Sequence, residues 1–316
     1  MNIQPDNRPA PLGFRLATPG SGLLILLLAF VVCLALASIL IPLLMMVVKR
    51  PEAGMRIGTV VQDMLVFIIP AIIAAMLSTR LPAKLLAVDV KPPFLTTAMA
   101  VLTLIVSAPA LNLIIHWNES IHLPESMAGL ENWFRQMEEA AAQATDIMMA
   151  GPSLGSLIVS ILIVGVLAGF SEELFFRGAL QRLMMATTLG SHLCIWLTAF
   201  IFSAFHFQFF GFVPRFLLGA YFGYLLWWTR SLWVPMIVHI VNNSIVVLGE
   251  WHTVNEGGTP GVFDNFGADL SNTADIIAVA VSVVLTVGGL IVIRRLVAKD
   301  QHTATVSQSG ADQSTL

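Results

Sequence analysis

The feature that most constrains this chain is an uncharged segment close to its start. Residues 21–48 contain no charged side chain and are mostly aliphatic. As a helix rising about 1.5 Å per residue, the segment is longer than the roughly 30 Å apolar core of a bilayer. It is too long for a secretory signal, and no small-residue cleavage site precedes a polar sequence. We therefore interpret it as a retained membrane helix.

The same kind of segment recurs along the chain, in which 57% of residues are hydrophobic and only 11% are charged. Soluble domains contain roughly 25% charged residues, so this composition requires lipid. Windows of apolar residues predict an all-α polytopic membrane protein, a bundle of about eight transmembrane helices. These cover residues 21–48, 59–79, 93–116, 153–185, 191–211, 213–229, 231–249 and 276–293. The sixth is the weakest because its uncharged core, 216–229, is short, and its Gly219 and Gly223 have the spacing of a close helix contact.

Lysine and arginine in short loops predict the orientation. If both termini are cytoplasmic, most of these residues fall on the inner side, although Lys49, Arg50 and Arg56 in the first loop fall outside. We expect an integral protein of the bacterial cell (inner) membrane with both termini cytoplasmic. Its first partner is then the lipid bilayer; the net charge of -3 and the lack of a basic run do not suggest nucleic acid.

The predicted spans divide the chain into five parts. They are an N-terminal cytoplasmic segment (1–20), N-terminal transmembrane helices with an acidic outer loop (21–150), a core of spans four to seven that contains the candidate catalytic residues described below (151–250), an outer loop with the last transmembrane helix (251–299) and a polar tail expected to be disordered (300–316). In the first outer loop, Leu130, Trp133, Phe134 and Met137 recur at helical spacing. This pattern predicts an amphipathic helix that lies on the membrane or caps the bundle.

Two adjacent glutamates lie within the fourth span. An ionisable side chain in a bilayer costs several kcal/mol unless it faces protein or water, so such groups are functional candidates. Glu173 and Arg177 have the i, i+4 spacing of an ion pair, whereas Glu172 points about 100° away. Glu172 is then free to act as a general base in a cavity. The alternative is that both glutamates mark a cytoplasmic helix end.

Histidines in two later spans complete the candidate site. His206 follows Phe202 by one turn, and the midpoint between positions 172 and 206 lies beside Gly190. A helical hairpin closed at that glycine places Glu172 and His206 at similar depth, where they can share one water. On its own, His206 could equally be a packing residue.

A histidine and an asparagine occur one turn apart in the seventh span. His239 and Asn243 share one helix face, and both can donate hydrogen bonds. Fixed donors of this kind can stabilise the oxyanion that forms during amide cleavage. The alternative is that the two side chains bind neighbouring helices and hold the bundle together.

The three motifs together resemble those of the CPBP family. The order Glu172-Glu173-x-x-x-Arg177, Phe202-x-x-x-His206 and His239-x-x-x-Asn243, within residues 150–250, is similar to that of CAAX prenyl endopeptidases and of the bacterial bacteriocin-processing or immunity (Abi) proteins. The resemblance implies an intramembrane endopeptidase of glutamate type, whose further partner is a peptide or membrane-protein substrate. It implies that Glu172 and His206 activate water, that His239 and Asn243 line the oxyanion hole, and that Glu173, Arg177 and Phe202 support the site.

Three other interpretations remain open. Glu172, His206 and His239 could hold Zn²⁺ in a zinc-dependent membrane protease, but we favour no cofactor because the sequence lacks a His-Glu-x-x-His pair. A noncatalytic bacteriocin-immunity or scaffold protein could keep the same fold. A transporter would need a continuous polar path, which the predicted spans do not show.

Overall fold

The structure, a computed structural model, describes residues 18–256 and 266–313, with side chains up to Asp300 apart from Glu256. In this part of the chain all regular secondary structure is helical. Six helices are long and apolar enough to cross a membrane, or seven if a bent pair counts as one span. The polytopic, all-helical fold is therefore confirmed, whereas the count of eight spans is not.

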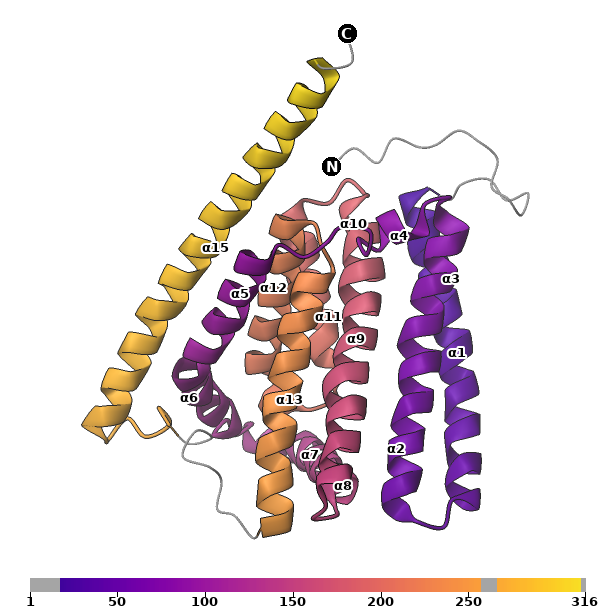
Figure 1. The fold of residues 1–316 in the computed structure, drawn as a ribbon. Helices are drawn as coiled ribbons and strands as arrows, with labels where there is room; N and C mark the ends of the chain where they lie inside the picture. The colour runs from indigo at the N-terminus through magenta and orange to yellow at the C-terminus, as the bar shows by residue number, and fades with distance from the viewer. Residues whose placement is uncertain (1–17, 257–265, 314–316) are drawn as a thin grey trace.

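The N-terminal half forms a helical hairpin, a bent helix pair and a crossing helix (Figure 1). Its elements are α1 (Pro19–Val47), α2 (Pro51–Gln62), the π-helical η1 (Asp63–Ile68), α3 (Ile69–Ser78), the short α4 (Pro82–Leu85), α5 (Phe94–Val106), α6 (Ala108–Glu119), the 3₁₀ turn η2 (Glu125–Met127) and α7 (Ala128–Met149). α2, η1 and α3 form one continuous helix that packs against α1. α5 and α6 meet at 48°, because Pro109 lacks the amide hydrogen that a straight helix needs.

The second half supplies the centre of the bundle. Residues 154–185 form one continuous helix of α8 (Leu154–Ser160), π-helical η3 (Ile161–Leu167), α9 (Ala168–Glu172), π-helical η4 (Glu173–Gln181) and α10 (Arg182–Met185). α11 (Ser191–Ala204), the 3₁₀ turn η5 (Phe209–Gly211), α12 (Phe212–Thr229), α13 (Trp233–Glu256) and α15 (Thr273–Gln313) follow. α13 packs against η3 and α9, and α11 against α12.

The fifth predicted span, 191–211, is shorter than expected. Its helix α11 ends at Ala204, and the backbone then turns through Phe207, whose φ of 54° is left-handed. A residue in that conformation cannot continue a right-handed helix. The sixth span, expected to be the weakest, is instead long enough to cross a membrane when η5 and α12 are taken together. Gly219 and Gly223 of α12 do form a close contact, against α11 and η4.

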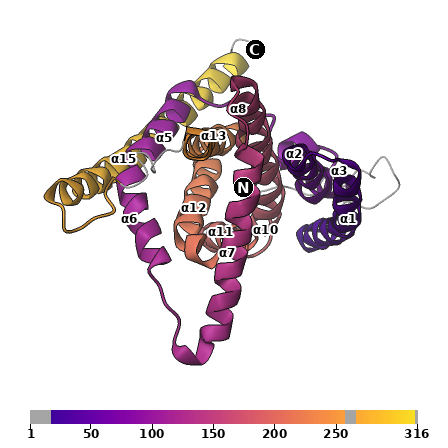
Figure 2. The same ribbon diagram turned by 90° about the horizontal axis from the view of Figure 1, so that it is seen from below.

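One end of the bundle is crossed by a helix, and the other is not. α1 begins and α15 ends at the upper end in Figure 1, whereas α7 lies across the opposite end, as the view from below shows (Figure 2). The predicted amphipathic helix in the outer loop is thus present as α7. Glu131, in the first turn of α7, accepts a hydrogen bond from the Leu123 amide, which joins the helix to the preceding loop. It also accepts a hydrogen bond from Arg135, one turn later on α7. These bonds hold the pKa of the Glu131 carboxyl at about 2.

Of the two ends of the chain, the structure describes most of the C-terminal one, and it differs from the prediction. Residues 1–17, most of the expected cytoplasmic segment, lie outside the described residues. The tail was expected to be disordered from residue 300, but α15 continues through Gln313. The sequence after Lys299 contains no proline, and its first glycine is Gly310, so no strong helix breaker interrupts the helix before that point.

Candidate active site

Glu173 is the buried centre of the candidate site. Its side chain is fully buried, and its Oε1 accepts hydrogen bonds from Arg177 Nη1 at 2.7 Å and from His239 Nδ1 at 2.8 Å. The predicted pair of Glu173 and Arg177 is therefore present, although η4 is a π-helix. The bond to His239 was not predicted. It joins the first motif to the third, and it leaves the other ring nitrogen of His239 free to act.

That second nitrogen faces the other glutamate. His239 Nε2 lies 3.7 Å from Glu172 Oε2, which is too long for a hydrogen bond. About 15% of the Glu172 side chain is exposed, whereas Glu173 has no exposed surface. The two adjacent glutamates thus contact opposite sides of one imidazole. Glu173 fixes the ring, and Glu172 keeps both carboxylate oxygens available for another molecule.

Aromatic rings enclose the buried charges. The His239 ring stacks on Phe222 with centroids 4.7 Å apart, and the edge of Phe202 lies against it at 5.8 Å. Arg177 lies over the Phe202 ring at 4.3 Å and donates to the Gly219 carbonyl at 2.9 Å. Cation–π contact and hydrogen bonding thus both stabilise a guanidinium that water does not reach.

His206 lies beyond the end of α11 rather than inside a transmembrane helix as expected. Its Nδ1 is 2.9 Å from the Phe202 carbonyl oxygen, and its ring contacts the Phe202 ring edge to face. Because a carbonyl oxygen only accepts, Nδ1 must carry the hydrogen. Nε2 of a neutral His206 is then an acceptor. The shared water of Glu172 and His206 stays a prediction, since no direct contact joins the two side chains.

Asn243 lies one turn after His239 on α13, as predicted. Its Nδ2 donates to the Val164 carbonyl of η3 at 3.3 Å, and its Oδ1 accepts from Asn242 at 3.2 Å. A carboxamide nitrogen has two hydrogens, so one remains for another acceptor. Within η3 the α-helical bonding pattern is broken, which is common at functional sites.

α13 approaches the first-motif helix closely because two glycines face it. A Cβ atom on Gly169 would lie 3.1 Å from the Ile240 amide nitrogen and 3.3 Å from its Cα, and one on Gly165 would lie 2.6 Å from Ser244 Oγ. Ile240 directly follows His239. The distance between the two glutamates and His239 therefore depends on the absence of a side chain at Gly169.

We expect Gly169→Ala to lower both stability and any activity of the site. The new methyl group meets backbone atoms, which cannot move aside as a side chain can, so overpacking costs about 1–3 kcal/mol. The control is Gly155→Ala in the same continuous helix, where the nearest atom is Ser153 Oγ at 3.9 Å. Thermal unfolding of both variants in detergent checks this; equal melting temperatures would show that α13 can shift freely.

The candidate zinc ligands do not form a metal site in this arrangement. In the part of the chain that the structure describes, no group of three or more His, Cys, Asp or Glu residues is placed to hold one ion. Nδ1 of His206 and of His239 is bonded to the Phe202 carbonyl and to Glu173, so only Nε2 of each ring could bind an ion, and these atoms are not grouped with Glu172 around one point. The residues proposed for zinc thus do not fit the metal as placed here, and no step below depends on one.

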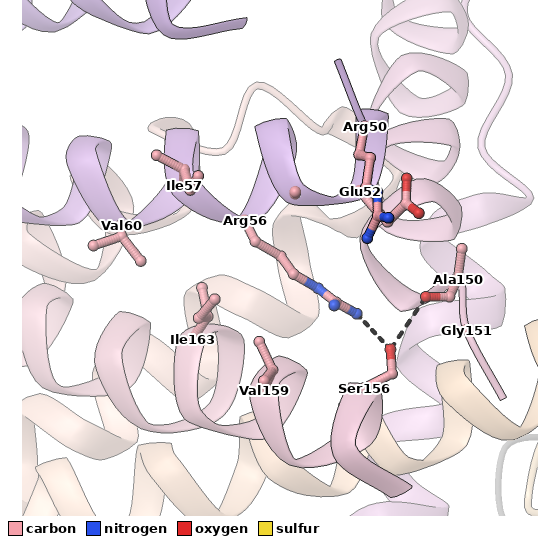
Figure 3. Close-up of a pocket in the computed structure, with 11 residues that line it drawn as sticks. Arg50, Glu52, Arg56, Ile57, Val60, Ala150, Gly151, Ser156, Val159 and Ile163 are labelled. Atoms are coloured by element: carbon pink, nitrogen blue, oxygen red, sulfur yellow. Dashed lines mark hydrogen bonds between the residues drawn. The ribbon is translucent and has the colours of Figure 1, made fainter. Parts of the chain in front are cut away.

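A cavity of about 550 Å³ lies between α2 and the first turns of the helix 154–185 (Figure 3). None of the predicted catalytic residues lines it. Arg56 reaches across its charged end and donates to Ser156 Oγ at 2.7 Å and to the Met148 carbonyl at 2.8 Å. Val60 and Ile163 lie at its apolar end. The cavity therefore lies near the end of the N-terminal hairpin where α2 begins, beside the start of the first-motif helix.

The sequence interpretation also missed one carboxylate. Asp63 lies within the second predicted span and is only 2% exposed. It lies on η1, which packs against α9 and η4, the elements that contain Glu172 and Glu173. A lone carboxylate in an otherwise apolar segment was the available signal.

Comparisons with known proteins place the family resemblance on the same segment. Residues 154–245 match the family described as type II CAAX prenyl endopeptidase Rce1-like. The uncharacterized protein YpbD of Bacillus subtilis strain 168 is 30% identical over 92 residues, which are 28% of this chain and 44% of YpbD. The match thus spans less than half of that relative. No solved structure matches the chain significantly. The predicted resemblance is confirmed, and the matched segment contains all three motifs.

Proposed function

Because residues 154–245 are an Rce1-like segment of the CAAX-protease type in an integral membrane protein, we propose that this protein is an intramembrane endopeptidase. Its substrate is a membrane-associated protein or peptide. The observation that carries the proposal is the placement of His239 between two glutamates, with Nδ1 2.8 Å from Glu173 and Nε2 3.7 Å from Glu172. A purely structural histidine would not need a second carboxylate that forms no hydrogen bond with it.

The first chemical step is the activation of water. Glu172 removes one proton from the water, and His206 Nε2 accepts a hydrogen bond from its other hydrogen. The water oxygen then bonds to the carbonyl carbon of the peptide, whose π electrons move to the carbonyl oxygen. The Phe202 carbonyl, bonded to Nδ1, keeps His206 in the tautomer that this step needs.

The second step stabilises and resolves the tetrahedral intermediate. Asn243 donates its remaining amide hydrogen to the oxyanion, and a protonated His239 donates through Nε2. Glu173 holds the ring in place through Nδ1. When the intermediate collapses, the carbon–nitrogen bond breaks, and the proton on Glu172 passes to the leaving amine. Glu172 thus returns to its carboxylate form.

Peptide cleavage by the purified protein tests the proposal. We expect the protein in lipid nanodiscs to cleave members of a peptide library and to incorporate one oxygen from H₂¹⁸O into each new carboxyl group, as mass spectrometry would show. A strong zinc chelator is expected to leave the rate unchanged. Loss of cleavage with the chelator, restored by zinc, would instead support the zinc-dependent protease. Cleavage of no library member or candidate membrane protein would favour the noncatalytic scaffold.

A further inference from the structure

The cavity at the start of the first-motif helix has a charged end that the proposed function does not use. Three charged side chains line it, Arg50, Glu52 and Arg56. Arg50 is the N-cap of α2, in the turn that follows α1, and α7 crosses the bundle at the same end (Figure 1). Since the ends of membrane spans lie at the level of the lipid headgroups, the charged end of the cavity lies at that level too.

Arg56 is held in place but has no acidic partner in the described part of the chain. Its Nε and Nη2 donate to the Met148 carbonyl at 3.2 and 2.8 Å, and Nη2 also donates to Ser156 Oγ at 2.7 Å and Ser160 Oγ at 3.2 Å. Both hydroxyls donate their own hydrogen to a backbone carbonyl, so they accept from Arg56. Nη1 keeps two hydrogens with no acceptor among the described residues. The guanidinium therefore offers a fixed positive charge and two donors to another molecule.

Arg50 and Glu52 complete the charge of this end. Within the described residues, neither side chain forms a hydrogen bond or an ion pair. Two guanidiniums and one carboxylate leave one positive charge in excess, which a phosphate diester with its one negative charge would balance. The predicted orientation places Arg50 and Arg56, together with Lys49, on the outer side against the usual bias. A bound anion gives this exception a physical reason.

The other end of the cavity is apolar and opens toward lipid. Val60 lines it and lies about 15 Å farther along α2 than Arg50. Ile57 and Val159, which also line the cavity, are 42% and 39% exposed on the surface of their spans, where acyl chains lie. The volume of about 550 Å³ accepts a headgroup and the first part of its chains. From cationic end to aliphatic end, the cavity thus follows the order of polarity of a phospholipid.

We propose that this cavity binds an anionic phospholipid, with Arg50 and Arg56 on the oxygens of its phosphate diester and the start of an acyl chain along Val60 and Val159. A guanidinium suits this role because its planar fork can donate two parallel hydrogen bonds to a phosphate. The lipid would contact both α2 and the helix 154–185. It would therefore join the N-terminal hairpin to the family-like segment and stabilise their packing.

Lipid binding to the purified protein tests this site. We expect native mass spectrometry in detergent to show that wild type binds phosphatidylglycerol about tenfold more tightly than phosphatidylcholine with the same acyl chains, and that Arg50→Gln loses this preference. Folding should be unaffected, because the Arg50 side chain makes no bond within the described residues. The control is Lys49→Gln, which removes the same charge from an exposed neighbour that does not line the cavity. Equal losses in the two variants would show attraction to surface charge alone and would overturn the proposal.

Inorganic phosphate distinguishes a lipid site from a site for the free anion. We expect phosphatidylglycerol to raise the melting temperature of wild type but not of Arg50→Gln, since a ligand that binds the folded state stabilises it. Inorganic phosphate at the same concentration should change neither temperature and should leave the lipid bound. If it displaces the lipid or stabilises wild type equally, the site recognises a free anion and the lipid assignment is wrong. Neither measurement uses peptide cleavage, so both apply whether or not the protein is a peptidase.

Discussion

Glu172→Gln is expected to lower kcat by about 10²- to 10⁴-fold, the contribution of a positioned general base. Glutamine keeps the shape of the side chain but cannot take a proton from water. Folding should be unaffected, since Glu172 accepts no hydrogen bond within the described part of the chain and His239 Nε2, at 3.7 Å, is too far away to donate one. KM should change little, because the lost interaction exists only in the transition state.

Single-turnover cleavage in nanodiscs measures this effect. The matched control is Glu139→Gln, at an exposed position on α7, which should keep the wild-type rate. Thermal unfolding of both variants confirms that they fold equally well. If Glu172→Gln cleaves at the wild-type rate, the general-base role belongs to another group.

Arg177→Met is expected to destabilise the protein by about 3–5 kcal/mol, because it leaves the charge of Glu173 buried without its partner. The same change removes the hydrogen bond to the Gly219 carbonyl and the contact with the Phe202 ring. Since Glu173 also orients His239, we expect activity to fall together with stability.

The chain offers a closely matched control for this prediction. Arg135 and Glu131 on α7 have the same i, i+4 spacing and the same 2.7 Å contact, and Arg135 lies 4.3 Å over the Phe210 ring. That pair is exposed, so Arg135→Met should cost about 1 kcal/mol or less for the ion pair. Thermal unfolding in detergent compares the two variants. Equal losses of stability would mean that the buried pair of Glu173 and Arg177 contributes no more to the free energy of unfolding than the exposed pair does.

Local spacing was enough to predict much of the site. The i, i+4 rule identified the pair of Glu173 and Arg177, and the apolar segments identified the fold. The ion pair persists in π-helical η4 because long side chains tolerate a small change of helical phase. The sequence also predicted that His239 and Asn243 share a face of one helix, and both lie on α13.

Contacts between distant helices could not be predicted in this way. His206 was expected inside a span, but the left-handed backbone at Phe207 follows from packing at the end of α11 rather than from residue type. The bond from His239 to Glu173 joins residues 66 positions apart. Asp63 and Glu172 come from separate helical units, and no sequence spacing reports how a hairpin docks against a bundle.

The placement of Asp63 has a consequence for biosynthesis. The hairpin leaves the ribosome and enters the membrane before residues 154–245 have been made, so Asp63 meets lipid before its neighbours on α9 exist. An aspartate at the centre of an inserting helix costs about 2.5–3.5 kcal/mol. The most apolar 18-residue stretch of Pro51–Ser78, with a mean hydropathy of 2.3, must outweigh that cost. Docking of the later helices then removes Asp63 from lipid, and this relief favours assembly of the complete bundle over an isolated hairpin.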